Sequence, residues 1–227
     1  MPGFSDNWAL QMNIGQTSYY GDLSTYDRNF AGKLEYESGL GIGIAAHKQL
    51  GKVFSLSGQI IGGSLNGQKN EFKMKSRLLE YNLHLKMDLV QLLAYRQPSK
   101  LGVNFIAGVG NFLFDTDLTE YYEGGEKTTN SKSRVPEFVW LLGGDIFYNI
   151  SDNTYLSLEM TIKRFQNDKI DAVVAGTEYD YYSFFSIGIG YRINRLFPVS
   201  AKRADKTLNK LSPYATPLYR PQLSQLR

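Results

Sequence analysis

The stretch Leu79-Glu80-Tyr81-Asn82-Leu83-His84-Leu85-Lys86-Met87-Asp88-Leu89 decides the fold of this chain. Its odd-numbered positions are apolar, whereas its even-numbered positions are polar or charged. A period of two is typical of a β-strand whose two faces meet different environments. At ~3.3 Å per residue the stretch extends roughly 36 Å, which crosses a bilayer core when the strand is tilted by ~45°. The pattern therefore predicts a β-strand that is long enough to span a membrane.

The same alternation recurs in seven other segments, at about 7–20, 34–47, 53–63, 101–114, 137–150, 154–165 and 179–193. The connections after the first, third, fifth and seventh strands are long and polar, including loops predicted at 64–76 and 115–135, and the others are shorter. All long loops then lie at one end, as in outer-membrane barrels. The sequence predicts an all-β protein, an eight-stranded antiparallel up-and-down transmembrane β-barrel over 1–193, with a C-terminal periplasmic extension over 194–227.

Composition excludes several classes of protein. The 227 residues carry 25 Lys and Arg against 22 Asp and Glu, a formal charge of +3, which is too small to indicate nucleic-acid binding. Cysteine is absent, so disulfides and thiolate metal sites are excluded. No window offers the ~20 continuous apolar residues of a membrane helix. The N-terminus lacks the features of a signal peptide, so an exported protein would have lost or replaced its signal.

The direction of the apolar face separates a membrane barrel from a soluble one. A lipocalin-like ligand-binding barrel would turn this face inward. Here the apolar face is nearly free of charge, and the opposite face carries charges of both signs that can pair in a narrow lumen. We therefore favour the membrane barrel. We expect a polar network in its lumen, formed by Glu35, Glu37, Glu80, His84, Lys86, Asp88, Asp145, Glu159, Lys163 and Arg192.

Aromatic residues gather toward the ends of the predicted strands, where membrane barrels carry interfacial girdles. A general preference of aromatic residues for strands explains their number but not their placement. One group is expected at the short-turn end, namely Trp8, Phe54, Tyr148 and Tyr191. The other group is expected at the long-loop end, namely Tyr19, Tyr20, Phe138, Trp140 and Tyr181.

Four segments carry a resemblance to known families: Ser18–Leu23, Phe105–Phe112, Asn167–Asp171 and Tyr181–Tyr191. They resemble the small OmpA/OmpX-type barrels, and more closely barrels of the Bacteroidota outer membrane. Among these are the barrel domain of that phylum's OmpA-like proteins and the barrel subunit of the type IX secretion machinery, which contacts a periplasmic lipoprotein ring. The resemblance covers roughly residues 7–193 and implies a bacterial outer-membrane location with both termini in the periplasm. No peptidoglycan-binding OmpA domain follows the barrel segment.

The segment 194–227 has a different composition, rich in basic residues and proline. One interpretation is a disordered tail. The other is a docking peptide for periplasmic or outer-membrane protein subunits, since basic segments with scattered Leu and Tyr can fold on binding. A short helix is predicted over 200–211. The residues predicted to bind the partner are Arg195, Lys202, Arg203, Lys206, Lys210, Tyr214, Tyr219 and Arg220.

Residues able to carry chemistry are few. Of the two histidines, His47 lies by the first short turn and His84 points into the lumen, so neither serves a Ser-His-Asp arrangement at the long-loop rim. Asp168 and Asp171 have a spacing too general to indicate a calcium site. No catalytic, cofactor or metal site is predicted. Eight strands leave an interior just wide enough for side chains, so we expect a plug of ion pairs rather than a small passive pore.

These observations predict a non-enzymatic integral outer-membrane β-barrel that contacts outer-membrane lipids. We expect it to act as a structural or anchoring subunit of a larger envelope complex, in secretion or outer-membrane assembly, through its periplasmic tail. A passive pore and an enzyme at the rim are the alternative functions.

Overall fold

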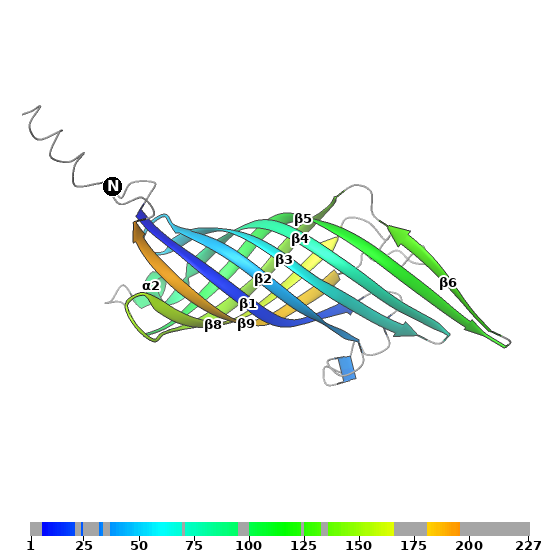
Figure 1. The fold of residues 1–227 in the computed structure, drawn as a ribbon. Coiled ribbons are helices and arrows are strands. Elements are labelled where there is room, and N and C mark those ends of the chain that lie inside the picture. The colour runs from blue at the N-terminus through cyan, green and yellow to red at the C-terminus, as the bar shows by residue number, and fades with distance from the viewer. Residues whose placement is uncertain are drawn as a thin grey trace, which may run out of the picture.

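The computed structural model describes residues 6–20, 24, 32–33, 37–69, 71–94, 100–123, 125–132, 136–165 and 181–195. Figure 1 shows an elongated barrel of tilted strands with a ribbon projecting from one end. The elements are β1 (Asp6–Tyr20), β2 (Ser38–Gln49), β3 (Phe54–Lys69), β4 (Phe72–Asp88), α2 (Leu89–Ala94), β5 (Leu101–Tyr122), β6 (Gly125–Lys132), β7 (Glu137–Asn149), β8 (Thr154–Phe165) and β9 (Tyr181–Arg195).

The strands close into a ring. Their order is β4-β3-β2-β1-β9-β8-β7-β5-β6, and β4 also pairs with β5, which joins the two sides of the sheet. Every pairing is antiparallel. Strand β6 pairs only with β5 among the described strands and lies outside the ring, so eight strands form the wall. The predicted eight-stranded antiparallel up-and-down barrel is confirmed.

The stagger of the strands fixes the tilt of the barrel. Partners can be followed around the wall in register from Ala9 to His47, Ser57, His84, Gly108, Leu141, Lys163, Tyr182 and finally Tyr19. The path returns to β1 ten residues beyond its start, which is a shear number of 10. With eight strands this stagger corresponds to a tilt of roughly 40°.

The outer face of the wall is apolar. Met12 is 60% exposed and Ile187 is 59% exposed, although both lie in the middle of long strands. Tyr181 and Tyr191 stand ten residues apart on β9, both outward-facing, which corresponds to a belt roughly 25 Å tall at this tilt. Exposed apolar side chains over such a band suit contact with lipid rather than water. The apolar face is therefore on the outside, and the lipocalin-like arrangement is wrong.

Aromatic side chains border this belt. At the short-turn end, Phe54, Tyr148 and Tyr191 are exposed. At the long-loop end, Trp140 and Tyr181 are exposed. The expectation for Tyr19 is wrong, because this side chain is fully buried inside the barrel. Its odd position on β1 places it on the lumen side, the same side as Gln11 and Asn13.

The loops predicted at 64–76 and 115–135 are largely strands. β3 and β4 continue to a tight connection between Lys69 and Phe72, and β5 continues to Tyr122 and pairs with β6. The extended parts of β3, β4 and β5, together with β6, form the ribbon that projects in Figure 1. Glycine, asparagine and lysine are depleted in strands, so the composition of these stretches favoured a loop over the strands that are observed. The connection between β4 and β5 begins with α2.

The side chains of β4 alternate between outward and inward along the whole strand, but the apolar face changes from outward to inward where the strand leaves the belt. On the membrane side, Leu79 and Leu83 face outward, whereas on the ribbon side Lys75 and Arg77 face outward and Met74 is fully buried. The change falls at the consecutive apolar pair Leu78-Leu79. Strand β5 changes at the matching level, since Leu79 pairs with Leu113 and Arg77 pairs with Asp115. Outside the belt the apolar side chains point inward, as they do in a protein surrounded by water.

Candidate functional site

The half of the lumen nearer the short turns contains a buried ion-pair centre. Lys86 on β4 donates to Asp145 on β7 at 2.7 Å and to Glu159 on β8 at 2.8 Å. Asp145 also accepts a hydrogen bond from Asn104 at 2.8 Å. Adjacent strands bring the two carboxylates together, because Asp145 and Glu159 are partners in the β7–β8 register. Two carboxylates around one ammonium allow all three charges to remain buried.

A second centre lies closer to the long-loop end. Lys163 on β8 and Glu80 on β4 are both fully buried and their charged atoms lie 3.1 Å apart. Tyr182 on β9 donates its hydroxyl to Glu80, and the Lys163 ammonium lies 4.9 Å from the centre of the Tyr182 ring. The buried ammonium thus has both a carboxylate and an aromatic face as partners.

Two amide side chains connect the centres. Gln59 on β3 donates to Glu159 at 3.4 Å, and Asn82 on β4 donates both to Gln59 at 3.3 Å and to Glu80. His84 hydrogen bonds to Asn82 through its Nδ1 atom at 2.8 Å. The result is a continuous polar network that runs along the lumen and crosses from β3 to β8. Two atoms of these residues, His84 Nε2 and Lys163 Nζ, have no hydrogen-bond partner among the described residues.

Between the network and the long-loop end, the lumen contains apolar side chains. Phe112 and Phe165 have ring centroids 4.5 Å apart, and the Phe165 ring also stacks on Tyr182. The cluster of buried apolar residues comprises Tyr19, Ile61, Leu65, Met74, Leu78, Phe112, Phe114, Leu118, Val139, Phe165, Tyr182 and Phe184. We call these residues the apolar cap. Among the described residues, the cap and the polar network lie one after the other along the lumen, and a cavity lies at its short-turn end.

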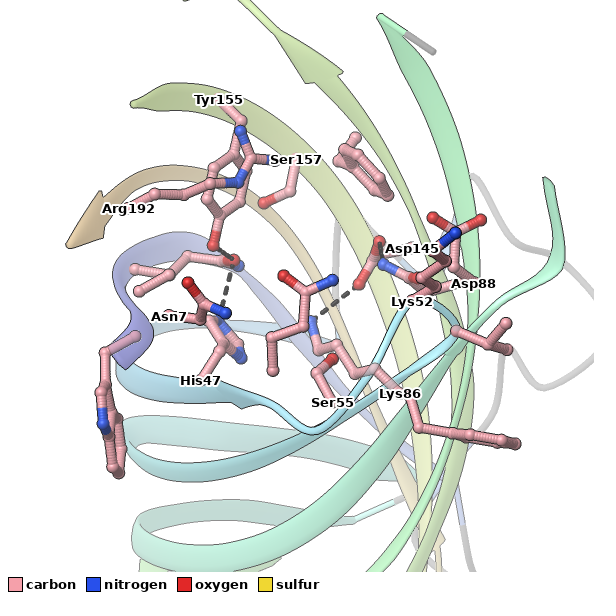
Figure 2. Close-up of a pocket in the computed structure, with 18 of the residues that line it drawn as sticks. Asn7, His47, Lys52, Ser55, Lys86, Asp88, Asp145, Tyr155, Ser157 and Arg192 are labelled. Carbon is pink, nitrogen blue, oxygen red and sulfur yellow. Dashed lines mark hydrogen bonds and ion pairs between the residues drawn. The ribbon is translucent and has the colours of Figure 1, made fainter. Parts of the chain in front are cut away.

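This cavity has a volume of about 220 Å³ and is shown in Figure 2. Tyr155, Ser157 and Arg192 lie on one side of it, and Lys52, Asp88 and Asp145 lie across from them. Tyr155 donates to Gln11 at 3.0 Å, and the Arg192 guanidinium lies 4.7 Å from the centre of the Tyr155 ring. Gly190 leaves room for this ring, because a Cβ atom there would come within 2.1 Å of it.

His47 lies at the floor of the cavity in a fixed hydrogen-bonding state. Gln11 donates through its Nε2 atom to Asn13 at 2.7 Å, so its Oε1 atom is the acceptor for His47 Nε2 at 3.1 Å. His47 Nδ1 then accepts from the Ser57 hydroxyl at 2.5 Å. A serine donating to a histidine resembles part of a nucleophilic site. Ser57 is fully buried, however, and does not line the cavity, so a substrate has no access to its hydroxyl.

The residues expected in the lumen network are only partly brought together. Glu80, His84, Lys86, Asp145, Glu159 and Lys163 lie in it. Asp88 instead accepts a hydrogen bond from the Gln91 backbone at 2.9 Å at the start of α2, and Arg192 stands at the cavity rim. Glu37 pairs with Lys33 at 2.9 Å within the first connection, away from both centres.

The remaining predicted site residues lie mostly outside the described part of the chain. Glu35 is one of them, as are the loop residues Asp168 and Asp171, the helix predicted over 200–211 and the docking residues from Lys202 onward. The backbone of Arg195 pairs with Asp6 at the end of β9, so this strand extends two residues beyond the predicted boundary at 193. The division at 193 and the docking role of the tail stay predictions.

Sequence reasoning missed the uncharged members of the site, namely Gln11, His47, Ser57, Gln59, Asn82, Tyr155 and Tyr182. Each stands on the same alternating face as the predicted charges, so its inward direction was available from the sequence. Their partners were not, because these depend on the stagger of strands that are far apart in the chain.

Among the described residues, no group of three or more His, Cys, Asp or Glu side chains is placed to hold a metal ion. No helix in that part of the chain is both long and apolar enough to cross a membrane.

Comparison with known proteins finds similarity in solved structures only. No family model matches the chain, and no curated protein matches it. It is similar to Ail, the attachment invasion locus protein of Yersinia pestis, at 9% identity, 83% coverage of this chain, 99% of that chain and a TM-score of 0.48. It is also similar to Neisserial surface protein A, at 11% identity, 82% coverage of this chain, 97% of that chain and a TM-score of 0.48. A major outer membrane protein of Thermus thermophilus is similar at 11% identity, 81% coverage of this chain, 99% of that chain and a TM-score of 0.46.

Proposed function

We propose that this chain is a non-enzymatic barrel of the bacterial outer membrane that acts as a non-conducting anchor in a larger envelope assembly. The observation that carries the proposal is the filled lumen. Lys86 and Lys163 are each buried against carboxylates, and the apolar cap lies above them. A barrel whose described lumen is occupied by such side chains acts through its ends rather than through its interior.

The filling of the lumen argues against a passive pore. An ion crossing the barrel would have to separate Lys86 from Glu159, whose charged atoms lie 2.8 Å apart and whose side chains are almost fully buried. It would then have to pass between Phe112 and Phe165, where no polar group could replace its hydration shell. Both steps cost several kcal/mol, because they leave buried charges without partners.

The two ends of the barrel suggest two different roles. The short turns, α2 and both described chain ends lie at one end, and the ribbon of β3 to β6 lies at the other. Outer-membrane barrels place their short turns in the periplasm and their long connections outside the cell. By that rule the segment after Arg195 enters the periplasm. Its basic composition and the resemblance to Bacteroidota barrels support attachment to periplasmic subunits, of which a secretion machine is one candidate.

Co-purification tests the anchoring role. A tagged full-length chain is extracted from native membranes beside a variant that lacks residues 198–227. We expect the full-length chain to retain periplasmic or outer-membrane subunits that the shortened chain loses, while both keep the same β-rich circular dichroism spectrum. A shared set of co-purified proteins would overturn the anchoring role of the tail.

Planar-bilayer recording tests the closed lumen separately. We expect no steady conductance from the purified full-length chain. Phe112→Ala and Phe165→Ala together open the apolar cap but leave the ion pairs below it, so this double variant should also stay closed. Steady conductance from the unaltered chain would favour the passive pore instead.

A further inference from the structure

The cavity at the short-turn end has acidic residues on one side and hydrogen-bond donors on the other. Its acidic members are already engaged. Asp145 accepts from Lys86 and Asn104, and Asp88 accepts from the backbone at the start of α2. Lys86 thus balances the charge of Asp145, whereas Asp88 accepts one backbone hydrogen bond and keeps further acceptor positions.

Arg192 on the opposite side of the cavity is in a different state. Its guanidinium donates to the Asn149 side-chain oxygen at 2.6 Å and to the Asp152 backbone oxygen at 3.5 Å. Both acceptors are neutral, and within the described residues no carboxylate pairs with this cation. A guanidinium has five N–H donors, and these two bonds use two of them. The guanidinium also lies over the Tyr155 ring, 4.7 Å from its centre, at the edge of the cavity.

Ser157 provides a second donor on the same side. It lines the cavity, it is only 5% exposed, and its hydroxyl has no hydrogen-bond partner among the described residues. Ser157 and Tyr155 lie two residues apart on β8 and face the same way, next to Arg192 on β9 (Figure 2). A buried polar atom without a partner is costly, so a ligand that accepts from it gains affinity.

We propose that this cavity binds a small carboxylate, with Arg192 and Ser157 as its donors. A guanidinium and a hydroxyl suit the two oxygens of one carboxylate group. The ring of Phe147, which faces the lumen and also lines the cavity, suits a short apolar or peptidic body. The ligand is either a free small acid or the carboxyl end of a peptide, and both have the same chemistry at this site. The inference is independent of the anchoring role, since it concerns the barrel alone.

Titration calorimetry of the full-length chain in detergent tests the site. The probe is N-acetylalanine, and its matched control is N-acetylalaninamide, which lacks the negative charge. We expect saturable binding of the acid at concentrations up to about 10 mM and no saturable binding of the amide. Arg192→Gln and Ser157→Ala should each weaken binding of the acid about tenfold or more. Lys132→Gln, which removes an exposed cation from the distant ribbon, should leave it unchanged.

Tryptophan fluorescence tests whether the acid binds at this cavity. The chain has two tryptophans, so Trp140→Phe leaves Trp8 at the cavity as the single reporter. Binding should change the emission of Trp8 with the same midpoint as the calorimetric titration. The tripeptide Gly-Gly-Ala separates the two sources: tighter binding than N-acetylalanine identifies a peptide end, and weaker binding identifies a free acid. Equal responses to acid and amide, or an unchanged affinity in folded Arg192→Gln, would overturn the proposal.

Discussion

Lys86 on β4 reaches across the lumen to Glu159 on β8, and their charged atoms lie 2.8 Å apart with both side chains at most 5% exposed. The two residues are 73 positions apart in the chain and their strands are not neighbours in the wall. Asp145 joins them from β7, one of the two strands that separate β4 from β8. The pair therefore ties opposite parts of the barrel through its interior, in addition to the backbone hydrogen bonds of the wall.

Removal of the central cation should destabilise the barrel strongly. Lys86→Met leaves Asp145 and Glu159 as buried carboxylates without a counter-ion, and we expect a loss of about 3–5 kcal/mol in the free energy of unfolding. Urea unfolding in lipid vesicles measures it. Lys132→Met is the matched control, because that side chain is 70% exposed in its ion pair with Asp115, and should change stability by about 0.5 kcal/mol or less. Similar losses in both variants would contradict a stabilising role for the centre.

Glycines facing the lumen should tolerate substitution less well than glycines facing lipid. A Cβ atom on Gly108 would lie 2.4 Å from both the Leu83 carbonyl oxygen and His84 Cβ, whereas one on Gly58 would meet nothing within 4 Å. We expect Gly108→Ala to cost about 1–3 kcal/mol, since the neighbouring strand must move. Gly58→Ala should be close to neutral. The same urea titration compares them, and equal effects would show that the two positions are packed alike.

The membrane boundary on β4 can be located with single spin labels, which the absence of native cysteine makes straightforward. Leu83→Cys and Lys75→Cys both carry the label on the outward face of β4. We expect the label at position 83 to be accessible to dissolved oxygen and shielded from a water-soluble nickel reagent. The label at position 75 should be accessible to the nickel reagent and less accessible to oxygen. If position 83 is reached by the nickel reagent, the apolar belt is not in lipid.

The ribbon outside the belt should respond to acid at Asp115. A hydrogen bond from Asn130, followed in effect by the neighbouring Lys132, holds the pKa of this carboxyl below its ordinary value. A folded-state pKa that is lowered stabilises the folded ribbon above the unfolded-state value of ~3.9, and this contribution is lost as the pH falls through the folded value. An NMR titration of the Asp115 carboxyl should therefore have its midpoint below ~3.9 and move upward in Asn130→Ala. An unchanged midpoint in that variant would exclude the hydrogen bond as the cause.

Much of the fold was predictable because the alternation of side chains is a local property of a strand. The segment around Leu83 and His84 was enough to predict which side chains face outward along β4 within the belt. The ribbon was missed because its polar composition was interpreted as loop. A signal was nevertheless present in the consecutive apolar pair Leu78-Leu79, where the alternation changes phase between membrane and water.

By itself, the sequence determined that eight strands with one apolar face each would form a wall, and that residues such as Lys86 and Glu159 would lie on its inner side. Only the tertiary structure decided which of these residues meet. The reason is that contacts across the lumen depend on the stagger accumulated around the closed ring, a quantity that belongs to all eight strands together. The same stagger places Arg192 beside Tyr155 and leaves the cavity between them and the ion-pair centre.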